Sequence, residues 1–247
     1  MVGNNELEHI YRRIEHRMNK RLERLFEPIS LLLKNVDYYV AGNSCNSAAP
    51  NDYDIYPIQE NWNFDFDEIE KTASKMDIPV VSRTRNALTV VINGTPIQFC
   101  GYLKASLLEL ISSFDFAHVQ IGIRVHNVCS EGAYNHSTIE EVCTTQNWVE
   151  SRLLDTTWYV SSEYPLSSLM RIIKYVNRGT FSGRSYIPSL IDIVRDIVNR
   201  GYLNYEDFKD QLSAIDLELL ETEEIGSARN LYDTFCQKGL VMDPRME

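Results

Sequence analysis

Hydrophobic residues recur at steps of three and four through the first thirty residues, and this period predicts an amphipathic helix. Its apolar stripe is expected to face the protein core and comprises Leu7, Tyr11, Ile14, Met18, Leu22, Leu25 and Ile29. Basic residues fall largely between these positions: Arg12, Arg13, Arg17, Lys20, Arg21 and Arg24. We expect this basic face to be solvated, with contact to phosphate as the alternative. Pro28 predicts a break in the helix or a new first turn.

The pattern changes to that of strands after residue 37. A hydrophobic run at 38–40 predicts a strand that ends in small residues, and alternating acids and hydrophobes at 52–56 predict a half-buried second strand. Asn93-Gly94, between two β-rich runs, predicts a tight hairpin turn. The order expected over residues 37–125 is strand, helix, strand, helix, hairpin, helix, strand.

The chain is expected to become helical from about residue 137, where Ser137 to Glu140 have the pattern of a capping box. Further helices are predicted by a proline near the start and a glycine after the end, as in Pro165 with Gly179 and Pro188 with Gly201. The predicted fold class is therefore α+β, a mixed sheet with flanking helices followed by a C-terminal helical bundle. The two predicted domains are residues 1–136 and 137–247.

The composition is that of an ordinary globular chain, with 44% hydrophobic and 24% charged residues among 247. These values exclude disorder as a description of the whole chain. The formal net charge of −11 argues against broad binding of nucleic acid or of an anionic membrane. Much of the excess negative charge comes from the acidic stretch at 206–224, so it does not exclude a local site for a nucleotide.

Five scattered cysteines without a CxxC pair are typical of free thiols in a reducing compartment. The first residues are polar and acidic rather than those of a secretory signal, and the sequence has no apolar run long enough to cross a membrane. We therefore expect a cytoplasmic protein, in the host cytoplasm if the source is viral.

The sharpest motif joins a glycine turn to two aspartates. Gly42, Asn43 and Ser44 follow the first predicted strand, and the backbone amides and hydroxyl of such a turn can face an anion. Asp52 and Asp54 stand two apart on the second strand, so their side chains share one face. Two close carboxylates repel each other and favour a hard divalent cation, Mg²⁺ or Mn²⁺, which proteins often bind together with substrate phosphates.

This motif resembles that of the polymerase-β-like nucleotidyltransferase superfamily, in which a strand, a glycine turn and an Asp-hydrophobic-Asp run follow one another. Here they are Val40 to Ser44 and Asp52 to Ile55. More narrowly, the chain looks like the divergent nucleotidyltransferase-like proteins of phages and large viruses. That impression is carried by Thr84 to Thr89, Ile97-Gln98-Phe99, Phe114-Asp115-Phe116 and Arg171 to Gly179.

The resemblance implies a third carboxylate on a neighbouring strand, where this chain has Gln98. A glutamine is neutral and cannot act as a base. Either Asp115 supplies the missing carboxylate, or the site binds a nucleotide without efficient catalysis. Basic residues should meet a triphosphate, and the candidates that join Gly42, Asn43 and Ser44 are Arg83, Arg85, Lys174 and Arg178.

The sequence thus predicts a metal-dependent nucleotidyltransferase that moves a nucleotidyl group from a nucleoside triphosphate to a hydroxyl of RNA, protein or a small molecule. Asp52 and Asp54 would hold the metal, and Asp115 would complete the catalytic set. The alternative is a catalytically weak or inactive protein of the same fold that binds a nucleotide or a partner protein. A third hypothesis is an interaction protein whose acidic C-terminal helices contact a basic partner.

Overall fold

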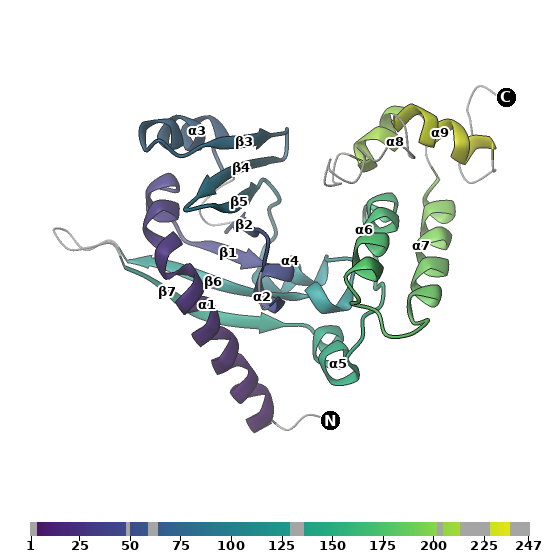
Figure 1. Cartoon of the computed structure of the whole chain (residues 1–247), viewed down its shortest axis with the longest axis horizontal. Coiled ribbons are helices and arrows are strands. Elements are labelled where there is room, and N and C mark those ends of the chain that lie inside the picture. The colour runs from purple at the N-terminus through teal and green to yellow at the C-terminus, as the bar shows by residue number, and fades with distance from the viewer. Residues whose placement is uncertain are drawn as a thin grey trace. The chain divides into compact units, whose positions relative to one another are not determined.

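The computed structural model describes residues 4–47, 50–58, 64–128, 136–201, 205–212 and 228–237. The chain divides into two compact units (Figure 1), which are described separately below. The sheet unit comprises residues 1–112 and 119–149. The helical unit comprises residues 113–118 and 150–247.

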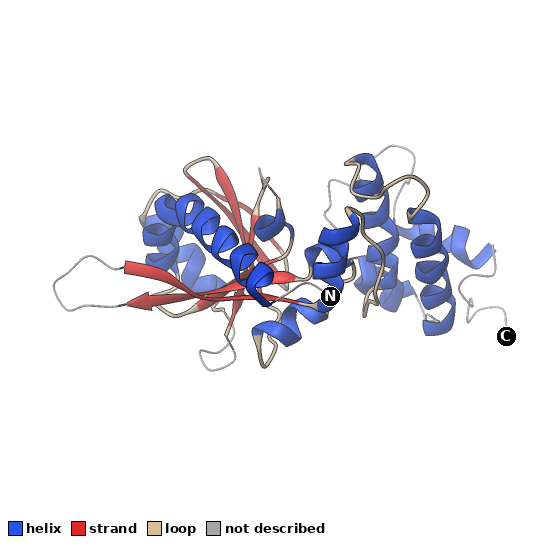
Figure 2. Ribbon diagram, turned by 90° about the horizontal axis from the view of Figure 1, so that it is seen from below, coloured by secondary structure: helices blue, strands red, loops and turns tan. Residues whose placement is uncertain are grey.

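The sheet unit is built on one mixed sheet of seven strands (red in Figure 2), in the order β3-β4-β5-β2-β1-β6-β7. The strands are β1 (Tyr38–Ala41), β2 (Tyr53–Pro57), β3 (Val80–Arg83), β4 (Ala87–Ile92), β5 (Thr95–Cys100), β6 (Ile121–Val128) and β7 (His136–Thr144). Among the strand pairs of the described residues, only β2 and β5 run parallel. The predicted hairpin is confirmed, because β4 and β5 are joined at Asn93 and Gly94, both at positive φ.

One face of this sheet forms the main core with α1 (Asn4–Leu32) and α3 (Phe66–Lys75). The predicted apolar stripe of α1 points inward, with Ile14, Met18, Leu22, Leu25 and Ile29 all buried. The helix does not break at Pro28 and continues to Leu32. Proline cannot donate to the carbonyl four residues back, and Asn93 Nδ2 donates to that Arg24 oxygen instead, at 3.1 Å.

The opposite face of the sheet carries α4 (Leu107–Ser112) over strand β6. The helix approaches so closely that a Cβ added to Gly122 would lie 2.7 Å from Leu107 Cδ1 and 3.1 Å from Ile111 Cγ2. The short helix α2 (Asn43–Asn46) follows β1, and a 3-10 turn (Ala117–Val119) precedes β6. Part of this second face is therefore packed, and the remainder carries the polar residues considered below.

The prediction of a helix at 137 is wrong, because β7 pairs with β6 over His136–Thr144. Ser137 and Ile139 are buried on the core side, and the Ser137 hydroxyl donates to Asn127 Oδ1 at 2.6 Å. The helix begins later, at α5 (Gln146–Leu154), where Thr145 Oγ1 accepts from the Trp148 amide. The boundary predicted between residues 136 and 137 therefore falls inside the sheet unit.

The helical unit contains α6 (Pro165–Asn177), α7 (Tyr186–Arg200), α8 (Tyr205–Leu212) and α9 (Ala228–Gln237). Pro165 opens α6, and Gly179 and Gly201 follow α6 and α7 at positive φ, as the sequence predicts. Helices α6 and α7 pack against each other, and α8 contacts α6 and α9. None of the helices described is both long and apolar enough to cross a membrane.

Candidate functional site

The glycine turn lies where β1 ends. Gly42 has φ 88° and ψ −151°, a conformation that only glycine adopts readily. Its amide donates to the Ile121 carbonyl at 2.9 Å, which ties the turn to β6. The chain then enters α2, so Asn43 and Ser44 occupy the first turn of a very short helix.

Asp52 and Asp54 lie beside this turn, because β2 runs antiparallel to β1 and Asp54 is level with Ala41. Tyr53 and Ile55 are buried in the core, whereas Asp54 is half-buried and Asp52 is exposed. The alternation of a strand therefore turns Asp54 toward the face opposite α1, and Asp52 directly precedes this strand. The structure thus brings together the two predicted metal ligands and the predicted phosphate-binding turn.

Helix α1 holds the far end of α2 through two arginines. Arg17 Nη2 donates to the Cys45 carbonyl, and Arg21 Nη1 donates to the Ser47 carbonyl at 2.7 Å. These carbonyls lie at the C-terminal end of α2, where cations are favourable. The basic face of α1, which the sequence alone assigns to solvent or phosphate, thus supplies two side chains that position the turn.

The two side chains that follow Asn43 are buried. Ser44 is 3% exposed and donates to the Ala41 carbonyl at 3.4 Å, so its hydroxyl is turned back to the chain. Burial raises the pKa of the Cys45 thiol to about 12, with a small contribution from the charge of Asp54 and against opposition from Ser44, Arg17 and Arg21. A thiol with that pKa is not an active nucleophile, so the structure favours a structural role for Cys45.

Gln98 occupies the position where a third carboxylate is expected. It lies level with Asp54 on the parallel neighbour β5 and level with Thr89 on β4. Its amide donates to Thr89 Oγ1 at 3.3 Å, and its side-chain oxygen accepts from the Cys100 thiol. The side chain beside Asp54 is therefore a neutral amide with partners of its own.

The structure does not bring Arg83 and Arg85 to the aspartates. Arg83 lies on edge strand β3, three strands from β2 or roughly 14 Å at ordinary strand spacing. Its guanidinium pairs with Asp67 at 2.6 Å and with Glu70, and these hydrogen bonds raise its pKa. Arg85 is exposed in the turn between β3 and β4.

Asp115, Lys174 and Arg178 belong to the helical unit. Asp115 is 4% exposed, and its Oδ2 accepts from Ser168 Oγ and from Arg171 Nη1, both at 2.8 Å. Lys174 is half-buried in the last turn of α6, and Arg178 is exposed directly after it. The sequence reasoning missed Ser168 and Arg171 as partners of Asp115, although their spacing of three places them on one helix face.

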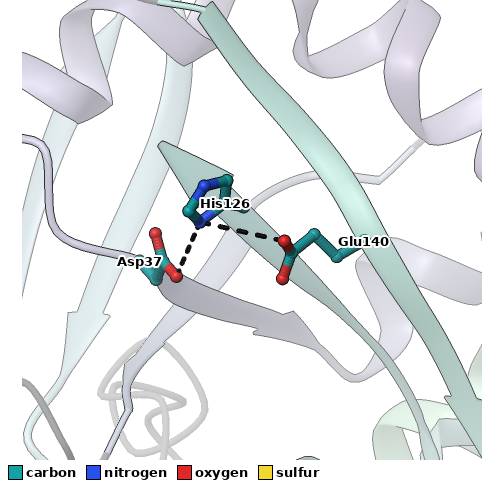
Figure 3. Close-up of side chains that lie close together, drawn as sticks. All are labelled: Asp37, His126 and Glu140. Atoms are coloured by element: carbon teal, nitrogen blue, oxygen red, sulfur yellow. Dashed lines mark hydrogen bonds and ion pairs between the residues drawn. The ribbon is translucent and has the colours of Figure 1, made fainter. Parts of the chain in front are cut away.

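A second polar cluster lies near the start of β1 (Figure 3). His126 Nδ1 lies 2.9 Å from Asp37 Oδ2 and 3.9 Å from Glu140 Oε1. Arg124 Nη2 and Nε approach Asp37 Oδ2 and Glu140 Oε2, both at 3.4 Å. The hydrogen bond that His126 makes to the Asp37 carboxylate raises the pKa of His126. Partial burial raises the pKa of Asp37, but bonds from His126 and the Asn127 amide outweigh it and lower that pKa overall.

Sequence reasoning missed this second cluster. The spacing of Arg124 and His126 indicates a shared strand face, but Asp37 is remote in sequence and Glu140 was assigned to a helix.

Comparison with known proteins adds little to this geometry. No protein-family model matches the sequence, and no curated protein matches it. A solved structure entitled "tRNA-processing enzyme (apo form I)" is similar over 97% of this chain, with 13% identity and a TM-score of 0.42. The chain spans 58% of the length of that solved chain. A TM-score at this level does not establish a shared fold.

Proposed function

We propose that the sheet unit carries a metal-dependent nucleotidyl-transfer site at Asp52 and Asp54, of the polymerase-β-like kind and of its divergent phage and large-virus type. The observation that supports the proposal most is the register that sets Asp54 level with Ala41, one residue before the Gly42 turn. This register joins a carboxylate pair to a turn that only glycine forms readily. Such an arrangement suits a nucleoside triphosphate held through a metal and its phosphates.

The donor set fits a hard cation. Asp54 lies on β2 and Asp52 directly precedes it, and β2 contains neither histidine nor cysteine. Mg²⁺ or Mn²⁺ held by Asp52 and Asp54 would neutralise phosphate charge and polarise the group under attack. The chain itself would contribute the Gly42 turn as the place for the phosphates and the α1 arginines Arg17 and Arg21 as its support.

A second candidate function is nucleotide binding without efficient transfer, and Gln98 favours it. The position level with Asp54 holds a neutral amide, so β5 adds no carboxylate to Asp52 and Asp54. Fewer carboxylates weaken the hold on a second metal ion and leave the acceptor hydroxyl without a base. The acceptor, in the transfer hypothesis, is a hydroxyl of RNA, protein or a small molecule.

Nucleotide binding is tested by calorimetry with each of the four ribonucleoside triphosphates and Mg²⁺. The comparison is between the wild type and the double variant Asp52→Asn with Asp54→Asn. A matched control is Glu23→Gln with Glu27→Gln, which removes two exposed acids from α1 and changes the net charge equally. We expect saturable heat with the wild type and the control, and loss of at least tenfold in affinity with the double variant. Equal affinity in all three proteins would overturn the site.

Transfer is separated from binding by incubation with α-labelled triphosphates and a pool of RNA and protein acceptors. Labelled product or pyrophosphate release that Asp52→Asn abolishes supports the transferase. Binding without either product supports the second candidate. The variant Gln98→Asp sharpens the choice, because a site limited by its missing carboxylate should gain activity when an acid stands level with Asp54.

A further inference from the structure

We propose that Asp37, His126 and Glu140 form a second metal site, which binds a divalent transition metal of the Zn²⁺ class. Asp37 directly precedes β1, His126 lies on β6 and Glu140 lies on β7 (Figure 3). Each offers one ligand atom, and the three atoms lie within 4.8 Å of one another. The proposal does not depend on the function proposed above.

The distances suit a single ion. A Zn²⁺ ion holds nitrogen and oxygen ligands at about 2.1 Å, so neighbouring ligand atoms lie roughly 3.0–3.5 Å apart. His126 Nδ1 lies 2.9 Å from Asp37 Oδ2 and 3.9 Å from Glu140 Oε1. The first pair needs almost no movement, and the second needs a rotation of an exposed glutamate side chain.

Each carboxylate offers one oxygen to the ion and keeps the other for a partner. Asp37 Oδ1 accepts from the Asn127 amide at 2.9 Å, which fixes the plane of the carboxylate and turns Oδ2 toward His126. Glu140 Oε2 faces Arg124 Nε at 3.4 Å, while Oε1 faces the imidazole. Polar contacts to the non-ligating oxygens support metal ligands, because they fix ligand orientation. Here Asp37 Oδ1 has a hydrogen bond, and Glu140 Oε2 has an ion pair.

A break in strand register brings Glu140 into the cluster. Arg124 pairs with Glu141, whereas Val125 pairs with Ile139, so Glu140 is the extra residue of a β-bulge in β7. Strict alternation would send Glu140 to the opposite face from Glu141. A bulge re-aims one side chain and is frequent beside functional sites, and here it turns Glu140 toward the face that carries Arg124 and His126.

A metal ion at this site must compete with Arg124 for the carboxylates of Asp37 and Glu140. The contacts of Arg124 to Asp37 and Glu140 are both 3.4 Å, longer than an ordinary hydrogen bond to a carboxylate. One of these contacts uses Glu140 Oε2, which is not the proposed ligand atom. With neutral His126, the formal charge of Asp37, Glu140 and Arg124 is −1, which still attracts a divalent cation.

The donor set selects the class of ion. An imidazole nitrogen with two carboxylate oxygens and no thiolate suits Zn²⁺, Ni²⁺, Co²⁺ or Mn²⁺ rather than the soft Cu(I). Mg²⁺ and Ca²⁺ prefer oxygen ligands alone. The site is also separate from Asp54, since Asp37 precedes β1 and Asp54 is level with its last residue, roughly 13 Å away at the rise of a strand.

The test is titration of the metal-free full-length protein with Zn²⁺ by calorimetry. Affected variants are His126→Ala and Glu140→Gln, and matched controls are His16→Ala, an exposed histidine, and Glu141→Gln, the exposed neighbour on β7. We expect one strong site in the wild type and both controls, and at least a tenfold loss of affinity in His126→Ala and Glu140→Gln. Circular dichroism confirms that each variant is folded.

Two further measurements test the second metal site independently of the proposed nucleotidyl-transfer site. Co²⁺ bound at His126 should give visible d–d absorption that His126→Ala abolishes. Zn²⁺ affinity should be unchanged in Asp52→Asn with Asp54→Asn, whatever happens to nucleotide binding there. The absence of saturable Zn²⁺ binding, or equal affinity in the wild type and His126→Ala, would overturn the assignment.

Discussion

Asp115 in the helical unit and Asp52 with Asp54 in the sheet unit show how differently one residue type is used. Asp115 is buried and accepts hydrogen bonds from Ser168 and Arg171, so its charge is offset inside the protein. Asp52 is exposed and Asp54 half-buried, beside the neutral Gln98. A buried charge needs a dedicated partner, whereas a metal ligand needs an accessible oxygen. The contacts of Asp115 therefore favour a structural role, whereas the exposure of Asp52 and the partial exposure of Asp54 suit a binding site.

If this contrast holds, the buried polar residues of the helical unit should contribute most to the free energy of unfolding. The largest contribution is expected from His118, through the dependence of stability on pH. Burial lowers the pKa of His118 to about 4, against opposition from Asp115 and with a smaller contribution from Arg178. Its Nδ1 shares a 2.8 Å hydrogen bond with Thr157 Oγ1, and its ring packs edge-on against Tyr175. The folded protein therefore holds this imidazole neutral.

The direction in which stability changes with pH follows from the pKa of His118 in the unfolded and in the folded chain. The unfolded chain takes up a proton near pH 6.5, whereas the folded chain resists it until about pH 4. Stability is therefore complete above pH 6.5 and falls as the pH drops to 4, by about 3 kcal/mol from this group. Urea unfolding of the wild type and His118→Gln between pH 7.5 and 4 measures the difference. An acid slope as steep in His118→Gln as in the wild type would contradict the prediction.

Removal of the partner of Asp115 should give the next largest effect. Arg171→Met leaves a carboxylate of 5% side-chain exposure to which the Ser168 hydroxyl still donates. We expect a loss of about 2 kcal/mol in the free energy of unfolding, since Arg171 itself is one-third exposed. The double variant Arg171→Met with Asp115→Leu should recover part of that loss, because it removes the buried charge as well. If the double variant is less stable than the single one, the pair does not act in this way.

A smaller loss of stability is expected from a substitution on the sheet face that carries Asp54, at Gly122, where α4 packs against the sheet. Gly122→Ala places a methyl group 2.7 Å from Leu107 Cδ1 and 3.1 Å from Ala41 Cβ, so the Leu107 side chain must move, at a cost of about 1–2 kcal/mol. The variant Gly122→Ala with Leu107→Ala should regain part of the packing. Thermal unfolding of both variants measures this, and a Gly122→Ala protein as stable as the wild type would contradict tight packing of Leu107 against Gly122.

Much of the fold follows from periodicity. The apolar stripe of α1, the Asn93-Gly94 hairpin and the Pro165 and Gly179 ends of α6 depend on local signals that agree with the tertiary structure. Ser137 to Glu140 were misassigned because the capping-box pattern is equally compatible with a strand whose alternate residues are buried. Pairing with β6 decides between the two, and pairing partners are not local in sequence.

The two candidate sites likewise differ in how far the sequence alone predicts them. Gly42, Asp52 and Asp54 are close in sequence, so their juxtaposition could be predicted from one strand–turn–strand pattern. Asp37, His126 and Glu140 are brought together by sheet order and by a bulge, neither of which the sequence displays.

The smallest effect on stability is expected at Asp52, where the effect on binding should be large. Asp52 is exposed and directly precedes β2, so Asp52→Asn should change the free energy of unfolding by less than about 0.5 kcal/mol. Its affinity for nucleotide with Mg²⁺ should nevertheless fall, because an amide oxygen is a weaker ligand for Mg²⁺ than a carboxylate.

The matched measurement is made on Asp115→Asn, for which the contrast predicts the reverse pattern of lost stability without a specific effect on nucleotide affinity. Arg171 and Ser168 would then face an amide in place of a carboxylate, which weakens two charge-assisted hydrogen bonds. Both variants are compared at a temperature where each is fully folded, so that unfolding does not imitate lost binding. If Asp115→Asn reduced nucleotide affinity as strongly as Asp52→Asn, Asp115 would act as the third carboxylate, and the division between the two acids would fail.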